Sequence, residues 1–434
     1  MRRALLLLAA AFAAPASAQT VAIVNGTVTI GDGSQPIPNG AVVFRDGRIV
    51  AAGAGVQAPA GATVVDARGG WVTAGTVAAY TDLGLSDGGY GVPESNDVAA
   101  AQAPYGASVD VAPAVNPANS RLGNERFGGV TRAFVAPAAG PSIFAGRGAV
   151  IDLGDDPDPI TRARAFQLVE LGERGAEISG GSRPATFAAL RDALAQAQDF
   201  RSSPGGFDGR GRDALVKRAD AQALLDVIDG RTPLLVHVER ASDIRAVLGL
   251  PRDYPRLRLM LLGATEGWMV AREIAAARVP VIAAALADLP ASFEQLAASE
   301  SNVGRLTRAG VTTAISTIGA NNAPGDHILT QYAGNLVAIG RVPGAAGLSW
   351  GEAFAAITSK PAEVMGMADE IGSLRPGRRA DVVIWSGDPL ELSSAPQTVF
   401  VDGRQQPATS RQRELRDRYM TPTEGALPKA YERR

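Results

Sequence analysis

Strand-and-helix units repeat through the middle of this chain, and they limit its fold more than any other feature. Residues 232–239 form an apolar run typical of a buried strand, and they follow a segment whose apolar residues, from Ala221 to Ile228, recur at helical spacing. Further strands and helices alternate up to about residue 315. Alternation of this length is typical of a parallel sheet in an α/β protein. The number of units predicts a closed (β/α)8 TIM barrel over about residues 71–365.

Both ends of the chain have a different pattern, in which short apolar strands alternate with tight turns. Turn signals such as Asn25-Gly26 separate the strands near the start, and the same pattern returns around residues 380–403. We predict that residues 20–70 and 366–408 pair into one small composite β-sandwich domain. Residues 409–434 carry charges of both signs and are predicted to form a solvated tail.

A long irregular segment interrupts the barrel pattern. Residues 86–126 are rich in glycine, proline, asparagine and alanine and show little periodicity. Segments of this kind are either binding loops or disordered. We expect this one to be a loop excursion over the barrel mouth.

The first 18 residues have the pattern of a secretory signal peptide. A positively charged start precedes an apolar stretch, Ala4 to Ala14, and the small residues Ala16-Ser17-Ala18 resemble a cleavage site. The apolar stretch is too short for a lasting bilayer span, although an uncleaved anchor is the alternative. We therefore expect cleavage after Ala18 and a periplasmic or secreted protein without a membrane anchor.

Cysteine content and charge exclude several classes of function. The chain has no cysteine, which suits an oxidising compartment and rules out thiolate metal ligands and cysteine nucleophiles. Its 42 basic and 44 acidic residues give a net charge of −2, so there is no excess of basic residues to bind nucleic acid.

Three segments resemble the amidohydrolase superfamily, and in particular its exported imidazolonepropionase-like members. They are the opening segment 25–75, the barrel stretch 234–281 and the closing segment 372–390, which contains the turn Pro376-Gly377. The resemblance implies a TIM barrel with a composite β domain. It also implies metal-assisted hydrolysis of carbon–nitrogen bonds other than ordinary peptide bonds, in cyclic amides or dipeptide-like substrates.

The residues that bind metal in this family are mostly absent from the corresponding positions. The family's first barrel strand ends in His-x-His, with both side chains on one face, and here Tyr80 and Asp82 stand in those places. The ligand on the fifth strand is kept as His237. The sixth-strand histidine and the eighth-strand aspartate have no counterpart in residues 262–264 and 314–319.

A reduced metal site remains one interpretation of what is left. Glu239 lies two residues beyond His237 and so on the same face of the strand, and together with Asp82 these residues could hold one zinc ion. Asp152 is a candidate for the place of the family's bridging lysine. The alternative, which we favour because so many ligands are missing, is no metal and a His237 that is hydrogen-bonded in the barrel mouth.

Three further residues are candidates for the site. His327 falls in the loop after the eighth strand, where such barrels carry active-site residues, and with Asp82 it could perform acid–base catalysis without metal. Alternatively, it is a surface-loop histidine. Tyr80 and Glu266 are candidates for substrate contacts, although a carboxylate in a first helical turn also suits the helix dipole.

Two functions follow from these observations. The chain is either a diverged hydrolase with a reduced site, or a non-catalytic relative that binds a small ligand or serves as the partner subunit of an intact amidohydrolase, in a hetero- or homo-oligomer. The chemistry of the missing ligands favours the second function, since function depends on the site and not on the fold.

Overall fold

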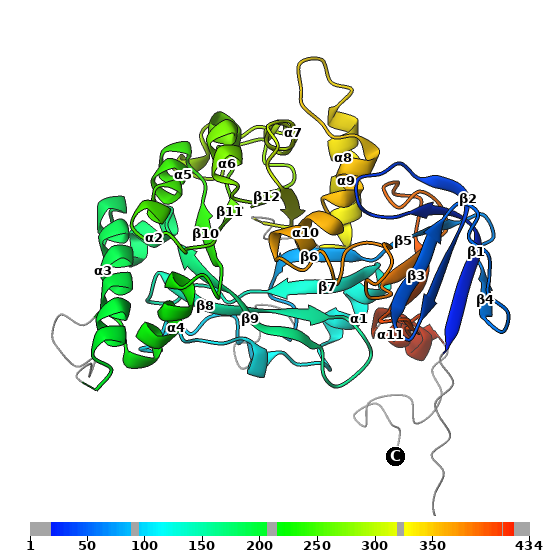
Figure 1. Ribbon diagram of the computed structural model, residues 1–434, viewed down its shortest axis with the longest axis horizontal. Helices are drawn as coiled ribbons and strands as arrows, with labels where there is room; N and C mark the ends of the chain where they lie inside the picture. Colours follow the sequence, from blue (N-terminus) through cyan, green and yellow to red (C-terminus); the bar gives the residue numbers. More distant parts are fainter. Residues whose placement is uncertain (1–18, 88–94, 206–214, 319–324, 410, 421–434) are drawn as a thin grey trace, which may run out of the picture.

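The computed structural model describes residues 19–87, 95–205, 215–318, 325–409 and 411–420. Two sheets of eight strands dominate it, one built from the two ends of the chain and one from the middle (Figure 1). The predicted signal peptide, residues 1–18, lies outside the described residues. No helix in the described part is long and apolar enough to cross a bilayer.

The terminal sheet joins strands from both ends, as the pattern predicts. Its strand order is β16-β15-β14-β5-β1-β2-β3, and β4 pairs with β1. Phe44 of β2 and Phe400 of β15 lie far apart in this order, yet their ring centroids are 5.3 Å apart, so the sheet curls over its own apolar core. The strands are β1 (Thr20–Thr29), β2 (Ile37–Arg45), β3 (Arg48–Gly53), β4 (Thr63–Asp66), β5 (Trp71–Ala74), β14 (Val382–Trp385), β15 (Pro396–Val401) and β16 (Arg404–Gln405).

The second sheet is a nearly closed barrel, which confirms the predicted fold class. Its strands follow chain order from β6 to β13, and the hydroxyl of Ser316 in β13 bonds to both backbone groups of Tyr80 in β6 across the seam. The strands are β6 (Thr76–Thr81), β7 (Val130–Val135), β8 (Phe144–Asp152), β9 (Ile160–Glu170), β10 (Leu234–Val238), β11 (Leu259–Gly263), β12 (Val281–Ala284) and β13 (Thr313–Ser316).

One barrel strand departs from the uniform strand–helix alternation that we predicted. Strand β8 runs antiparallel to both β7 and β9. The connections on either side, residues 136–143 and 153–159, are short and contain two prolines each, and proline disfavours a helix interior. The chain therefore turns back through β8 in place of two helical crossovers.

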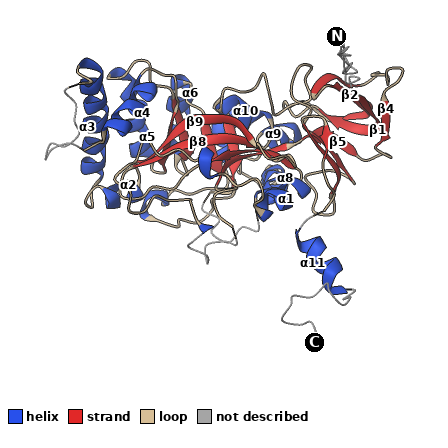
Figure 2. Ribbon diagram, turned by 90° about the horizontal axis from the view of Figure 1, so that it is seen from below, coloured by secondary structure: helices blue, strands red, loops and turns tan. Residues whose placement is uncertain are grey.

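Helices cover most of the barrel's outer face (Figures 1 and 2). In two of the strand-to-strand connections a 3-10 turn precedes the α-helix: η4 (Gly267–Val270) precedes α6, and η5 (Phe293–Gln295) precedes α7. The remaining 3-10 turns are η2 (Ala112–Ala114), η3 (Leu250–Arg252) and η6 (Asp326–Ile328). The α-helices are α1 (Ser120–Phe127), α2 (Glu173–Ile178), α3 (Arg183–Ser202), α4 (Arg218–Ile228), α5 (Ala241–Leu248), α6 (Ala271–Ala277), α7 (Asn302–Arg308), α8 (Leu329–Ile339), α9 (Trp350–Ala355), α10 (Ser359–Val364) and α11 (Arg411–Met420).

The irregular segment 86–126 packs against the barrel wall, and our prediction that it arches over the mouth is wrong for this packed part. Val109 and Val111 exchange backbone hydrogen bonds with Arg147 on β8. Ala107 and Leu122 are buried in the same apolar cluster as the helices that cover the other strands. The segment thus buries the face of the barrel that the missing crossover helices would have covered.

A buried arginine connects the two sheets. The side chain of Arg132 in β7 is completely buried and donates two hydrogen bonds to Asp381, at 2.7 and 2.9 Å, and one to Asp402 at 2.7 Å. Asp381 immediately precedes β14 of the terminal sheet, and Asp402 lies in the turn between β15 and β16. Burial disfavours the guanidinium charge, but these carboxylates outweigh it and raise the pKa of Arg132. Arg132 therefore remains charged and forms a buried ionic link between the sheets.

Candidate functional site

Side chains alternate between the two faces of a strand, and this alternation places ionisable side chains of β9 and β10 in the mouth of the barrel. In β9, Phe166 and Leu168 belong to the interior core, so Glu170 at the strand's end shares their face. In β10, Leu235 belongs to that core, and His237 shares its face. Because β9 and β10 are parallel neighbours, with His237 opposite Glu170, their ends meet at one edge.

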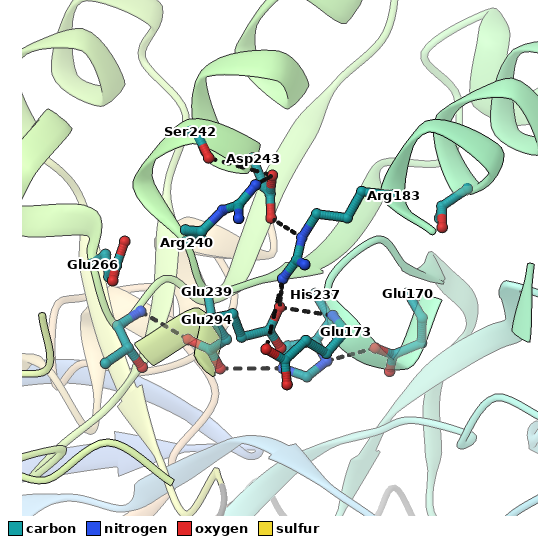
Figure 3. A network of polar contacts seen from close by, with 12 residues as sticks. Glu170, Glu173, Arg183, His237, Glu239, Arg240, Ser242, Asp243, Glu266 and Glu294 are labelled. Carbon is teal, nitrogen blue, oxygen red and sulfur yellow. Dashed lines mark hydrogen bonds and ion pairs between the residues drawn. The ribbon is translucent and has the colours of Figure 1, made fainter. Parts of the chain in front are cut away.

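His237 lies between two carboxylates (Figure 3). Its Nδ1 is 2.6 Å from Oε2 of Glu170, and its Nε2 is 3.3 Å from Oε1 of Glu239. The side chain of His237 is 26% exposed, whereas those of Glu170 and Glu239 are 9% and 4% exposed. Both ring nitrogens therefore face oxygen atoms of the protein.

The electrostatics of this triad favour a charged histidine. Burial disfavours the imidazolium, but the charges and hydrogen bonds of Glu170 and Glu239 outweigh it and raise the pKa of His237 well above its usual value. For Glu239, burial would raise the pKa, and the hydrogen bonds from His237 and Thr265 outweigh it and lower that pKa. The arrangement is an imidazolium held between two carboxyl groups.

Glu239 also fills the space in front of the sixth strand. Its Oε2 accepts a hydrogen bond from the backbone N–H of Thr265 at 2.8 Å. Gly263, at the end of β11, has φ = +85°, and a side chain there would collide with the Glu239 carboxylate. Gly263 stands in the segment where the family carries its sixth-strand ligand. Its lack of a side chain leaves the space that the Glu239 carboxylate occupies.

A network of ion pairs lies beside the triad and connects several loops. Arg183, at the start of α3, contacts Asp243 at 2.7 Å and Glu294 at 3.1 Å. Glu294 comes from the loop after β12, and it also accepts a hydrogen bond from the backbone N–H of Glu173. These contacts hold the loops after β9, β10 and β12 to one another beside His237 (Figure 3).

Asp82 and His327 both contact helix α1. Asp82 forms an ion pair with Arg121 at 2.8 Å. His327 is held by Glu125 of the same helix, through its backbone N–H at 2.7 Å and its Nδ1 at 3.1 Å. The structure thus gives the two predicted acid–base residues different partners on one helix, and it records no contact between them.

Asp326 is a site residue that the sequence pattern did not reveal. It is 3% exposed and accepts hydrogen bonds from Thr81 at 2.7 Å and Thr317 at 2.8 Å, which lie at the ends of the first and eighth strands. Burial, reinforced by the nearby Glu125, raises the pKa of Asp326 to about 6. A carboxyl group therefore reaches the ends of these two strands from the following loop.

We expect the titration of Asp326 to make stability depend on pH. A folded-state pKa above the unfolded value of about 3.9 favours the folded protein at low pH, and this contribution is lost as the pH rises from about 4 to about 6. Asp326→Asn removes this loss, so the variant should gain on the order of 1 kcal/mol over the wild type between pH 4.5 and pH 7.5. Urea denaturation at both pH values tests this, with the exposed Asp369→Asn as control. An equal difference between variant and wild type at both pH values would contradict the assignment.

The other predicted residues have mainly structural contacts. Tyr80 packs against the interior core and bonds to Ser316 through its backbone. Both carboxylate oxygens of Glu266 accept backbone N–H groups, from Ala241 and Ala297. The substrate contacts proposed for Tyr80 and Glu266 stay predictions.

Asp152 lies at the opposite end of the barrel from the mouth, which corrects its suggested place beside the metal. Because β8 is reversed, its last residue, Asp152, is paired with Arg132 near the start of β7. Glu170 ends the fourth strand instead. A carboxylate at the end of an apolar run, Leu168-Val169-Glu170, is the signal that would have identified it.

The three predicted metal ligands do not converge in the structure. His237 and Glu239 are neighbours, whereas Asp82 is paired with Arg121. Within the described ranges, no three side chains of histidine, aspartate or glutamate are grouped so that they could hold an ion.

Comparison with known proteins shows which proteins the chain resembles. The sequence model of the Amidohydrolase family matches residues 235–406. The chain is 24% identical to an imidazolonepropionase from Mesorhizobium japonicum over 398 residues, which covers 82% of this chain and 88% of that protein. It is 40% identical to an amidohydrolase, tasK, from Hapsidospora irregularis over 60 residues, but this match covers only 14% of the chain and 6% of that protein.

Solved structures agree on the fold. An amidohydrolase from Thermotoga maritima superimposes with a TM-score of 0.77 at 22% identity, covering 89% of this chain and 99% of that one. Molinate hydrolase superimposes with a TM-score of 0.54 at 17% identity, covering 96% and 99%. The chain is therefore similar to the amidohydrolase superfamily in the sequence of its C-terminal half and in its fold.

Proposed function

We propose that this protein is a small-ligand-binding member of the superfamily that does not carry out metal-assisted hydrolysis. The observation that carries the proposal is the placement of His237, whose two ring nitrogens face Glu170 and Glu239. A histidine binds metal through an unprotonated ring nitrogen, and here both nitrogens are directed at carboxyl groups.

The donor set in the mouth supports the same conclusion. A catalytic zinc ion is typically held by three converging protein ligands and keeps one position for water. Here the first strand offers Tyr80 and an Asp82 that is paired with Arg121, and the eighth strand offers the hydroxyl groups of Ser316 and Thr317. These residues do not fit the family's metal, so we derive no reaction step from a metal-bound water.

A second candidate function is acid–base catalysis without metal. It is favoured by Asp326, whose raised pKa of about 6 places its titration near neutrality, beside the Glu125–His327 pair. In this function a half-exposed His327 would exchange protons with a ligand at the ends of the first and eighth strands. A slow hydrolysis that is insensitive to chelators and lost in His327→Gln would favour it.

We further propose that the protein acts outside the cytoplasm. The pattern of residues 1–18 supports export and cleavage after Ala18. In that compartment the chain would bind a small molecule by itself or as the partner subunit of an intact amidohydrolase. The composition gives no reason to expect a nucleic-acid partner.

Metal content and hydrolysis, measured together, test the proposal. The mature protein is purified without chelators, its metal is measured, and it is assayed against a panel of cyclic amides and dipeptides beside an intact imidazolonepropionase. We expect much less than one metal ion per chain and no turnover. Stoichiometric zinc with turnover, both lost in His237→Ala and both kept in the control His327→Ala, would overturn the proposal.

A further inference from the structure

A small pocket lies on the outside of the barrel wall, on the other side of the wall from the His237 triad. It has a volume of about 270 Å³ and lies between the loop 103–107, the start of β8, helices α2 and α3, and residues 215–220. Phe144 belongs to the outer apolar cluster, whereas the next residue, Ala145, faces the barrel interior. The pocket is therefore separated from the mouth by the wall of the barrel.

The walls of this pocket are mostly apolar. Tyr105, which is 49% exposed, borders it from the loop side. The apolar lining includes Pro104, Phe144, Ile178, Ala189 and Val216. A concave, largely apolar surface with a few polar groups is the usual form of a small-molecule site.

One buried carboxylate, that of Asp220, forms part of the wall. Asp220 is 4% exposed and lies in the first turn of α4. Its Oδ1 accepts three hydrogen bonds, from the backbone N–H of Gly106 at 3.2 Å and from the N–H and hydroxyl of Ser108 at 2.7 and 2.6 Å. Its Oδ2 accepts no hydrogen bond from any described residue.

The two carboxylate oxygens of Asp220 differ in their contacts, because only Oδ1 accepts hydrogen bonds from the described part of the protein. The hydrogen bonds by which Asp220 holds the loop carrying Tyr105 all go to Oδ1. Holding this loop therefore does not require Oδ2. Oδ2 remains in contact with solvent and is therefore open to a ligand in the pocket that Asp220 lines. Ser179, which also lines the pocket, has a buried hydroxyl without a partner among the described residues.

We propose that this pocket binds a small primary amine with an aromatic or branched aliphatic body. The ammonium group would donate to Oδ2 of Asp220, and its apolar part would pack against Phe144 and Ile178. The exposed ring of Tyr105 suits a cation at the rim, because cations bind favourably to aromatic faces. A volume of about 270 Å³ limits the ligand to roughly the size of one aromatic ring with a short arm.

Calorimetric titration with benzylamine tests this site, with benzyl alcohol as the neutral near-isostere. We expect one benzylamine per chain and at least tenfold weaker binding of benzyl alcohol, because the charge-assisted hydrogen bond is lost. Asp220→Asn should weaken benzylamine binding by about tenfold or more, since it keeps the loop's acceptor but replaces Oδ2 with a donor. The matched control Asp199→Asn removes one exposed carboxylate from the neighbouring α3 and should bind as the wild type does.

A second variant keeps the test independent of the loop's fold. Ala189→Phe fills the pocket without altering Asp220, and it should abolish benzylamine binding. Glu239→Gln, in the acidic mouth, should leave binding unchanged. The proposal is overturned if the wild type does not bind benzylamine, if binding survives Ala189→Phe, or if Glu239→Gln is the variant that removes it.

Discussion

Replacement of Arg132 by leucine is expected to lower the free energy of unfolding by about 3–5 kcal/mol. The side chain is completely buried and neutralises Asp381 and Asp402, with Asp152 at 3.6 Å. Removing the cation leaves these carboxylates buried or half-buried without their partner, and an uncompensated buried charge is far more costly than a lost surface contact. The terminal sheet would also lose this buried ionic link to the barrel.

Arg162→Leu is the matched control for this prediction. Arg162 pairs with Glu370 at 3.1 Å, but both side chains are about 40% exposed, at 39% and 42%. An exposed pair contributes about 0–1 kcal/mol, so this variant should unfold close to the wild type in urea. If the two variants were destabilised equally, Arg132 would not be the link that we describe.

His237→Gln is expected to destabilise the folded protein by about 2 kcal/mol at pH 6. The substitution removes a charged donor from two buried carboxyl groups, Glu170 and Glu239. Because the folded-state pKa of His237 is raised, its stabilising effect is complete below the unfolded pKa of about 6.5 and is lost as the pH rises through the folded pKa. The difference between variant and wild type should therefore shrink in alkaline solution.

Urea denaturation at pH 6, 7.5 and 9 measures this dependence. His327→Gln is the control, because His327 is 38% exposed and its ring bonds to one carboxylate, that of Glu125, among the described residues. It should cost less than His237→Gln at pH 6. A His237→Gln effect that grew with pH would mean that the histidine is neutral in the folded protein.

The sequence predicts those parts of the fold that depend on local patterns. The apolar runs at 234–238 and 259–263 are the strands β10 and β11, and the turn-rich ends form one joint sheet. The reversal of β8 was not predicted, because one apolar strand has the same periodicity in either direction. Only the short proline-containing connections before and after it indicate the antiparallel course.

For the site, the sequence predicted only contacts between residues of the same strand. Strand alternation places His237 and Glu239 on one face, and they are neighbours in the structure. Glu170, Glu125 and Asp326 were missed because their roles depend on contacts between segments 67, 202 and 245 positions apart in the chain. A single sequence does not show which distant residues pair with one another. These pairings decide which of the predicted residues are available to a ligand.

The central claim is that His237 is held by two carboxyl groups and is not available to a metal. Nitrogen NMR of protein with 15N-labelled histidine tests this directly, since the chain has only two histidines and His327→Gln leaves one. We predict that both ring nitrogens of His237 are protonated and hydrogen-bonded at pH 7, and that one equivalent of zinc leaves their signals unchanged. A neutral ring with one unprotonated nitrogen whose signal shifts on addition of zinc would contradict the account.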